Sequence, residues 1–302
     1  MFLQNFYRLS ILFLGLAILF NAVSKPLQSN VDTLFTGSAR SPRILLLTAH
    51  PDDECLFFAP TLTVLLSQAI GHDTNKIPQV YSLCLSVGDA DGLGDVRKEE
   101  LGRSLNVLGV EEGKRWILDQ PDLKDNITVY WSAESIANAL RPFVIENDIT
   151  TILTFDYEGI SSHPNHQSLP HGVVHLINSL AKDSIQHSPR VFALITVPLI
   201  HKYVGPLSAA LAKADVAFTA LLQQFGNMPS NPIGAARVPV FVAGISEYRT
   251  ALRAMLQHGS QLVWFRWLYV AFSRYMWVNE WLEIVPVTHT AAAGIPSPAF
   301  SI

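Results

Sequence analysis

The sequence Ile44-Leu45-Leu46-Leu47-Thr48-Ala49-His50-Pro51-Asp52-Asp53-Glu54 joins an apolar run to one imidazole and three carboxylates. The apolar residues 44–47 predict a buried strand. Open α/β sheets bind their ligands at the carboxyl ends of strands, which is where these charged residues fall. Adjacent carboxylates repel one another unless a cation or a proton compensates them. We therefore expect a ligand site directly after this strand.

A divalent metal is the simplest compensation for this cluster. His50 and Asp53 are suitable ligands, Pro51 stiffens the turn between them, and a remaining carboxylate stays free to move protons. A second interpretation needs no metal, because Asp52, Asp53 and Glu54 would also stabilise the positive end of a following helix dipole. This stretch alone leaves both interpretations open.

A second strand and loop repeat the arrangement farther along the chain. The apolar run 151–153 leads into a polar loop that carries His163 and His166, three residues apart. If the two loops meet at one sheet edge, they offer two imidazoles and one carboxylate to a metal, with a coordination position left open for water. A lone loop histidine would need no such explanation, but the convergence of ligand types favours a hydrolytic zinc site.

Between residues 42 and 205 the chain alternates between predicted strands and predicted helices. Strands are predicted at 44–48, 79–86, 115–118, 150–155 and 190–197, and helices at 56–69, 96–108, 133–147 and 171–181. Such alternation predicts mostly parallel strands joined by right-handed crossovers, in an α/β fold with a Rossmann-like three-layer sandwich. Both metal motifs then follow strand ends on one edge of the sheet.

An ordered set of motifs resembles the zinc-dependent LmbE-like, or PIG-L-like, deacetylases. The resemblance rests on His50-Pro51-Asp52-Asp53-Glu54, on His163-Pro164-Asn165-His166 and on the segment 86–101 between them. Further runs are similar to the eukaryotic branch of the family, at 118–125, 258–261, 264–266 and 272–275. That branch removes the acetyl group from N-acetylglucosaminyl-phosphatidylinositol in the second step of GPI-anchor synthesis. The same activity is therefore the expectation for this chain.

The resemblance implies a role for each residue of the two motifs. It implies that His50, Asp53 and His166 hold a zinc ion, although a His/Asp set also accepts other divalent metals. It implies that Asp52 is the general base. It also implies that His163 polarises the acetyl carbonyl or stabilises the tetrahedral intermediate.

Other positions concern the substrate rather than the metal. Arg97 resembles a family position that contacts the substrate near the sugar. The chain departs from the family pattern at Asp89, where asparagine is commoner, at Tyr157-Glu158, and at Ser162, where glycine is commoner. If that glycine supplies a positive φ, serine strains the loop that carries both histidines. None of these departures removes a presumed ligand or the base.

The composition and the N-terminus indicate membrane contact. Charged residues make up 15% of the 302 residues, against about a quarter in typical soluble domains. An apolar run spans residues 11–23, and Ala22-Val23-Ser24 resembles a signal-peptide cleavage site. The family resemblance implies instead an uncleaved anchor in the endoplasmic reticulum with a cytosolic catalytic domain. Lys25, Arg40 and Arg43 after the run agree with that orientation.

The C-terminal part departs from the alternating pattern. Residues 207–225 predict an apolar, alanine-rich helix, and residues 261–284 gather aromatic side chains beside Arg266 and Arg274. Such a segment suits a membrane interface, although a helix packed in the core is the alternative. The predicted divisions are an anchor or signal peptide at 1–25, a linker at 26–41, a catalytic core at 42–205, a helical, membrane-proximal extension at 206–287 and a flexible tail at 288–302.

Composition also limits the classes of partner. The net charge of −4 and the lack of a phosphate-binding glycine loop exclude nucleic-acid binding. Cys55 and Cys84 are too few for a disulfide framework. The expected partners are a membrane glycolipid substrate and the endoplasmic reticulum membrane, and the sequence identifies no protein partner. Two alternatives remain open, namely deacetylation of another N-acetylglucosaminyl conjugate and a non-catalytic membrane scaffold with the same fold.

Overall fold

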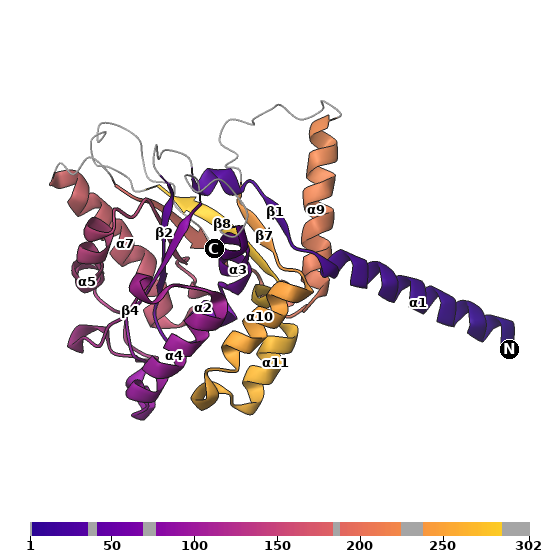
Figure 1. Ribbon diagram of the computed structural model, residues 1–302, viewed down its shortest axis with the longest axis horizontal. Helices are drawn as coiled ribbons and strands as arrows, with labels where there is room; N and C mark the ends of the chain where they lie inside the picture. The colour runs from indigo at the N-terminus through magenta and orange to yellow at the C-terminus, as the bar shows by residue number, and fades with distance from the viewer. Residues whose placement is uncertain (1, 36–40, 69–76, 184–187, 225–237, 286–302) are drawn as a thin grey trace, which may run out of the picture.

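One eight-stranded sheet runs through the protein (Figure 1). The computed structural model describes residues 2–35, 41–68, 77–183, 188–224 and 238–285. The strand order is β1-β7-β8-β6-β5-β2-β3-β4. The strands are β1 (Leu27–Ser29), β2 (Arg43–Thr48), β3 (Gln79–Cys84), β4 (Arg115–Ile117), β5 (Thr151–Phe155), β6 (Arg190–Leu194), β7 (Val240–Val242) and β8 (Val278–Ile284).

The strands β6-β5-β2-β3-β4 form a parallel half-sheet, as predicted. Helices connect successive strands of this half: α3 (Ala59–Gln68), α4 (Gly94–Leu108), α5 (Ala133–Glu146) and α7 (Pro164–Lys182). Helix α7 begins seven residues before the predicted His171. His163 is its N-cap and Pro164 fills its first position, where the missing proline N–H has no helical partner to lose. His166 therefore lies on the first turn of a helix rather than in a loop.

The order of the parallel strands creates a switch point between β2 and β5. The chain leaves β2 in one direction towards β3 and β4, then returns to the other side of β2 to form β5 and β6. Right-handed crossovers in opposite directions place their helices on opposite faces of a sheet. Figure 1 shows α5 and α7 on one side and α3 and α4 on the other. The residues that follow Thr48 and Phe155 thus meet at the crevice where such sheets bind ligands.

The other half of the sheet is antiparallel, so the prediction of a mostly parallel sheet is right only for the five strands above. Strand β8 pairs antiparallel with both β6 and β7, and β7 pairs antiparallel with β1. The strands β1 and β7 have three residues each, which is too short to show a periodic pattern. Helix α10 (Ile245–Met255), which follows β7, packs against α3 and α4.

The aromatic region 261–284 divides into two elements with opposite environments. Helix α11 (Trp264–Phe272) exposes most of its large side chains, whereas Trp277 and Trp281 are buried. Trp281 lies in β8 and donates a hydrogen bond to Thr61. The expectation of one membrane-proximal segment is therefore wrong for its second half, which belongs to the core. The predicted tail 288–302 lies outside the described residues.

Two long helices lie at the edge of the molecule. Helix α1 (Phe2–Ser24) contains an 18-residue window, Tyr7–Ser24, that is apolar and long enough to cross a membrane. By these criteria the helix fits an anchor or a signal sequence. Helix α9 (Leu207–Gln224) contacts the C-terminal end of α1, where Lys213 donates to the backbone carbonyls of Ala22 and Lys25. In Figure 1, α1 projects from the body of the protein and runs in a different direction from α9.

Candidate active site

A cavity of about 980 Å³ opens at the carboxyl ends of β2 and β5. The structure brings all six predicted site residues to its wall: His50, Asp52, Asp53, Arg97, His163 and His166. Helix α11 contributes a second wall through Phe265, Arg266, Leu268, Tyr269 and Phe272. Aromatic residues that the sequence pattern assigned to a membrane surface therefore also border the site.

Asp53 and His166 are oriented as two ligands of one ion. His166 Nε2 is buried, makes no hydrogen bond and lies 3.2 Å from Asp53 Oδ1. His166 Nδ1 lies 3.2 Å from the Gly159 carbonyl oxygen, so the proton belongs on Nδ1 and the lone pair on Nε2. Asp53 Oδ2 accepts the backbone N–H groups of Ala49 and His50. Two ligands of a tetrahedral zinc, each about 2.1 Å from the ion, would lie about 3.4 Å apart. The pair therefore fits a metal.

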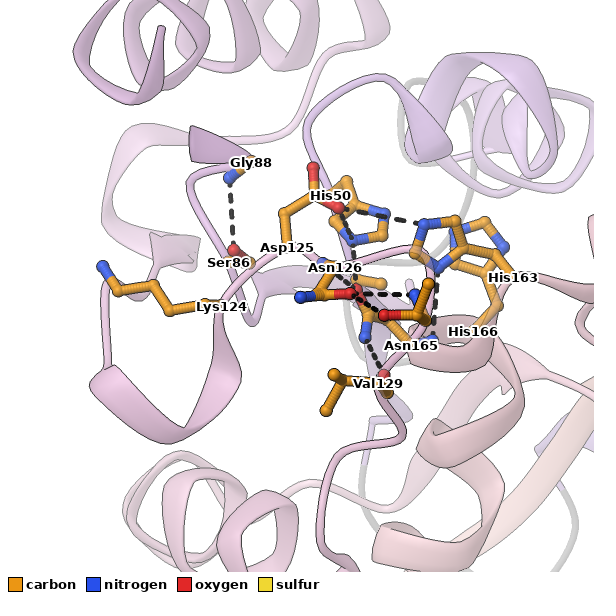
Figure 2. A network of polar contacts seen from close by, with 12 residues as sticks. His50, Ser86, Gly88, Lys124, Asp125, Asn126, Val129, His163, Asn165 and His166 are labelled. Atoms are coloured by element: carbon orange, nitrogen blue, oxygen red, sulfur yellow. Dashed lines mark hydrogen bonds and ion pairs between the residues drawn. The ribbon is translucent and has the colours of Figure 1, made fainter. Parts of the chain in front are cut away.

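His50 is held by two neighbours that sequence reasoning did not identify as site residues (Figure 2). Its Nε2 lies 2.9 Å from Asn165 Oδ1 and 3.2 Å from Asp125 Oδ1. A ring that donates from Nε2 keeps a lone pair on Nδ1 for a metal. The ligand nitrogens of His50, His163 and His166 all lie within 4.8 Å of one another. Asn165 lies inside the motif His163-Pro164-Asn165-His166, and Asp125 is the last residue of the run 118–125.

Asp52 has the environment of a general base. Its backbone is left-handed, with φ of 106°, and its N–H donates to Glu54 Oε2. The guanidinium of Arg266 lies 3.1 Å from its Oδ2. Burial raises the pKa of Asp52, Arg266 opposes that shift, and the charge of Asp53 adds to it. A buried carboxylate with a raised pKa beside a cation is typical of catalytic sites.

His163 is a neutral hydrogen-bond donor. Burial, followed by the charges of His50 and His166, lowers its pKa to about 4. Its Nδ1 accepts the backbone N–H of Asn165, so the neutral ring carries its proton on Nε2. That nitrogen lies 3.8 Å from Asp125 Oδ1, beyond a normal hydrogen bond. His163 can therefore donate from Nε2 to a bound oxygen atom.

A buried ion pair between Glu54 and His258 lies next to Asp52. Glu54 Oε1 lies 2.7 Å from His258 Nε2, both side chains are fully buried, and Ser104 also donates to this oxygen. Burial disfavours the charged form of Glu54, but His258 outweighs that effect and lowers the Glu54 pKa. Cys55 lies close to the pair, and burial raises the pKa of its thiol well above the ordinary value. Sequence reasoning gave neither member of the pair a role.

Arg97 connects two loops that border the cavity through hydrogen bonds. Its guanidinium donates to the carbonyl oxygens of Pro51 and Gly88 and lies 3.4 Å from Asp125 Oδ2. Gly88 has a positive φ of 72°, and a Cβ there would lie 2.5 Å from the guanidinium. These contacts give Arg97 a structural role in addition to the substrate contact expected from the sequence.

The backbone just before His163 and His166 is strained. Ser162 has φ of 60°, so the serine that stands where glycine is commoner in the family does adopt a positive φ. Ile160 has φ of 59° and ψ of −53°, an unfavourable conformation for a β-branched residue. Its backbone is held from both sides, because its N–H donates to Thr196 and its carbonyl accepts from Lys202. Strain that the surroundings enforce in this way is common beside active sites.

The variant Ser162→Gly is expected to raise the free energy of unfolding by about 0.5–1 kcal/mol. Removing the Cβ relieves about 1–2 kcal/mol of left-handed strain, and the greater freedom of glycine in the unfolded chain offsets part of that gain. Denaturant titration of the purified chain in detergent measures the change. Ser161→Gly is the control, because Ser161 is not among the described residues with positive φ, and it should lower stability. Equal effects of the two variants would contradict this explanation.

The fold and the site define a Rossmann-like α/β protein with a cluster of metal-ligand residues at its switch point. Residues 45–177 match the family model PIG-L, described as GlcNAc-PI de-N-acetylase. The chain is 37% identical to N-acetylglucosaminyl-phosphatidylinositol de-N-acetylase from Bos taurus, covering 79% of this chain and 82% of that protein. It is 31% identical to the protein of the same name from Arthroderma benhamiae, covering 85% and 90%. The chain belongs to the PIG-L family of deacetylases.

The fold is also found among solved deacetylase structures. N,N'-diacetylchitobiose deacetylase from Pyrococcus horikoshii superposes with a TM-score of 0.50 at 14% identity, covering 84% of this chain and 89% of that one. At this identity the similarity concerns the fold alone. It agrees with the mixed sheet and the helical layers described above.

Proposed function

We propose that this protein is a metal-dependent hydrolase that removes the acetyl group from N-acetylglucosaminyl-phosphatidylinositol. The product is glucosaminyl-phosphatidylinositol, and the reaction is the second step of GPI-anchor synthesis. The observation that carries the proposal is the unsatisfied Nε2 of His166, which faces Asp53 beside His50 and next to a buried carboxylate, Asp52. Membership of the PIG-L family supports the substrate.

The ligand set in this proposal is His50, Asp53 and His166. These donors fit zinc, although the same set accepts other first-row ions. When bound, such an ion lowers the pKa of water and polarises a carbonyl, which an unreactive amide requires. Asp125 and Asn165 orient His50 through its Nε2.

The protein's own side chains then move the proton and stabilise developing charge. Asp52 takes a proton from the attacking water and returns it to the amide nitrogen as the C–N bond breaks, so the amine leaves as a neutral group. The Nε2–H of His163 donates to the acetyl oxygen as negative charge builds on it, an effect worth about 3 kcal/mol in comparable sites. Arg266 holds Asp52 in place through the ion pair described above.

The shape of the cavity suits a sugar headgroup that is attached to lipid. Charged and polar residues form the part near His50, whereas Phe265, Leu268 and Phe272 form an apolar part of the wall. Its volume of about 980 Å³ lies at the upper end of the range for small-molecule sites. We place the protein in the endoplasmic reticulum membrane through α1, with the catalytic domain in the cytosol.

Removal of metal is expected to abolish release of acetate from N-acetylglucosaminyl-phosphatidylinositol. The purified full chain in detergent is stripped with a chelator, assayed, resupplied with zinc and assayed again. Restoration of turnover supports both metal and substrate. Lipid-free N-acetylglucosaminyl-inositol serves as a second substrate. Metal binding without turnover of the glycolipid would favour either another N-acetylglucosaminyl conjugate or the non-catalytic scaffold.

A further inference from the structure

We propose that α9, α11 and the short helix α8 (Leu199–Lys202) form one lipid-contacting face at the mouth of the cavity. On this face α9 lies along the bilayer surface, with its apolar side in the headgroup region. The inference rests on the proposed function for the identity of the substrate, and it specifies how a lipid-linked headgroup reaches the site. The occupant of the face is a phospholipid bilayer.

The outward side of α9 is an apolar stripe. Leu207, Leu211, Phe218 and Leu221 are between 47% and 59% exposed. With 100° of rotation per residue, these four positions fall within an arc of about 80°. The buried residues of α9 are the small Ser208, Ala209 and Ala212. A surface helix of a soluble protein turns its large apolar side chains towards the core, and α9 does the reverse.

The attachment of α1 fixes the orientation of this stripe. Lys213, on α9, binds the carbonyls of Ala22 and Lys25, at the end of the membrane-span window that stops at Ser24. Figure 1 shows that α9 does not continue α1 but runs in a different direction from this junction. A helix that is attached at the end of a membrane-spanning helix and turns away from its direction is positioned to lie along the membrane surface. A stripe of exposed leucine and phenylalanine on such a helix suits the boundary between headgroups and acyl chains.

The apolar surface continues from α9 to the mouth of the cavity. The Gly205 N–H, just before α9, donates to the Phe272 carbonyl at the end of α11. Helix α8 precedes this junction and exposes Leu199 and Ile200. Helix α11 exposes five further large side chains: Trp264, Phe265, Trp267, Leu268 and Phe272. Of these, Phe265, Leu268 and Phe272 also line the cavity. The lipid-contacting face and the entrance to the site thus share residues.

The chemistry of this face matches lipid headgroups. Helices α8 and α11 contain no aspartate or glutamate. Of their three basic residues His201 is exposed, whereas Lys202 donates to the Ile160 carbonyl and Arg266 pairs with Asp52. Tryptophan and tyrosine are enriched at membrane interfaces, and cationic side chains beside them interact with phosphate. An exposed apolar surface of several contiguous side chains marks an interaction site rather than ordinary solvent exposure.

The protein's own tryptophans test the α11 part of this face. Trp264 and Trp267 are exposed, whereas the other four are partly or fully buried: Trp116, Trp131, Trp277 and Trp281. The full chain is placed in vesicles of phosphatidylcholine and phosphatidylinositol that carry bromine on the acyl chains. We expect the brominated lipid to quench the fluorescence, and the double variant Trp264→Phe/Trp267→Phe to lose most of that quenching. Ready quenching of these tryptophans by aqueous iodide in vesicles would overturn the proposal and leave the face to a protein partner.

A matched pair of probes tests α9. In the double-variant background, Phe218→Trp places a probe on the stripe, and Thr219→Trp places one on the next residue, about 100° around the helix. Both positions are exposed. Brominated lipid should quench the first probe several-fold more than the second, and iodide should show the opposite preference. Equal responses of the two probes would overturn the orientation proposed for α9.

An activity measurement connects the face to the reaction. The variant Leu211→Glu/Phe218→Glu changes residues outside the cavity wall. We expect it to lower turnover of vesicle-embedded glycolipid several-fold while leaving turnover of detergent-dispersed glycolipid unchanged. Equal turnover by variant and wild type in vesicles would contradict the proposal. Fluorescence quenching requires no turnover. If the proposed function is wrong, turnover will be absent in vesicles and in detergent alike, while the quenching results stay the same.

Discussion

The variant Asp52→Asn is expected to lower kcat for deacetylation by about a thousandfold while leaving metal content unchanged. Asparagine has nearly the same size and keeps the backbone N–H that donates to Glu54. It cannot accept the proton of the attacking water, because an amide is far less basic than a carboxylate. Burial and the charge of Asp53 raise the pKa of Asp52, which makes it the better proton acceptor of the two. Asp53 is instead held in its charged form, because His166 and His50 outweigh the effect of burial and lower its pKa.

Asp91 provides the control for this prediction. It also lines the cavity, but it is exposed, and no hydrogen bond or ion pair ties it to the histidine cluster among the described contacts. Asp91→Asn should retain turnover close to that of the wild type. Acetate release and metal content are measured on the same preparations. Loss of metal from Asp52→Asn would make Asp52 a ligand, and full complementation of deacetylase-deficient cells by this variant would favour the scaffold.

The variant Glu54→Ala is expected to lower the free energy of unfolding by roughly 3 kcal/mol or more. The substitution leaves His258 buried without its partner and removes the acceptor for the hydroxyl of Ser104. It also removes the acceptor for the N–H of Asp52, whose left-handed backbone then loses one restraint. Thermal unfolding in detergent measures the loss of stability. Turnover should fall as well, because the position of Asp52 depends on the same carboxylate.

Glu99→Ala is the matched control for Glu54. Glu99 is exposed and its ion pair with Arg103 is 3.8 Å long, so its removal should change stability by less than about 1 kcal/mol. A double-mutant cycle with Glu54→Gln and His258→Gln measures the coupling of the buried pair directly. Additive effects in that cycle, or equal effects of the two alanine variants, would show that the pair is not a buried interaction of the kind described.

The parallel half of the fold could be predicted because its signals are local. Strands β2 and β5 are short apolar runs, and side chains of the types that bind metals follow β2 directly and β5 within 11 residues. The rule that places ligand sites at strand ends then brings His50 and His166 together from separate motifs. The sequence raises the positive φ of Ser162 only as a condition, through the resemblance to a family in which glycine is commoner at this position.

The rest of the site depends on contacts that no local pattern encodes. Asp125, His258 and Arg266 reach the cavity or its support from segments whose positions are fixed only when the chain packs. The aromatic density of 261–284 was compatible with a helix and with a strand. Only the pairing of β8 with β6 and β7 decides which tryptophans of the segment 261–284 are buried.

The position of β8 also governs the order in which the protein can fold during synthesis. Residues 278–284 leave the ribosome after every other strand, yet they form the only pairing between the parallel strands and the β7–β1 pair among the described residues. Until then the outer edge of β6 has no partner, and such an edge is prone to aberrant pairing. The apolar helix α1 emerges before these strands and can engage the membrane long before the sheet closes. A nascent chain of this protein therefore has an open edge at β6 from the time that β6 emerges until β8 follows.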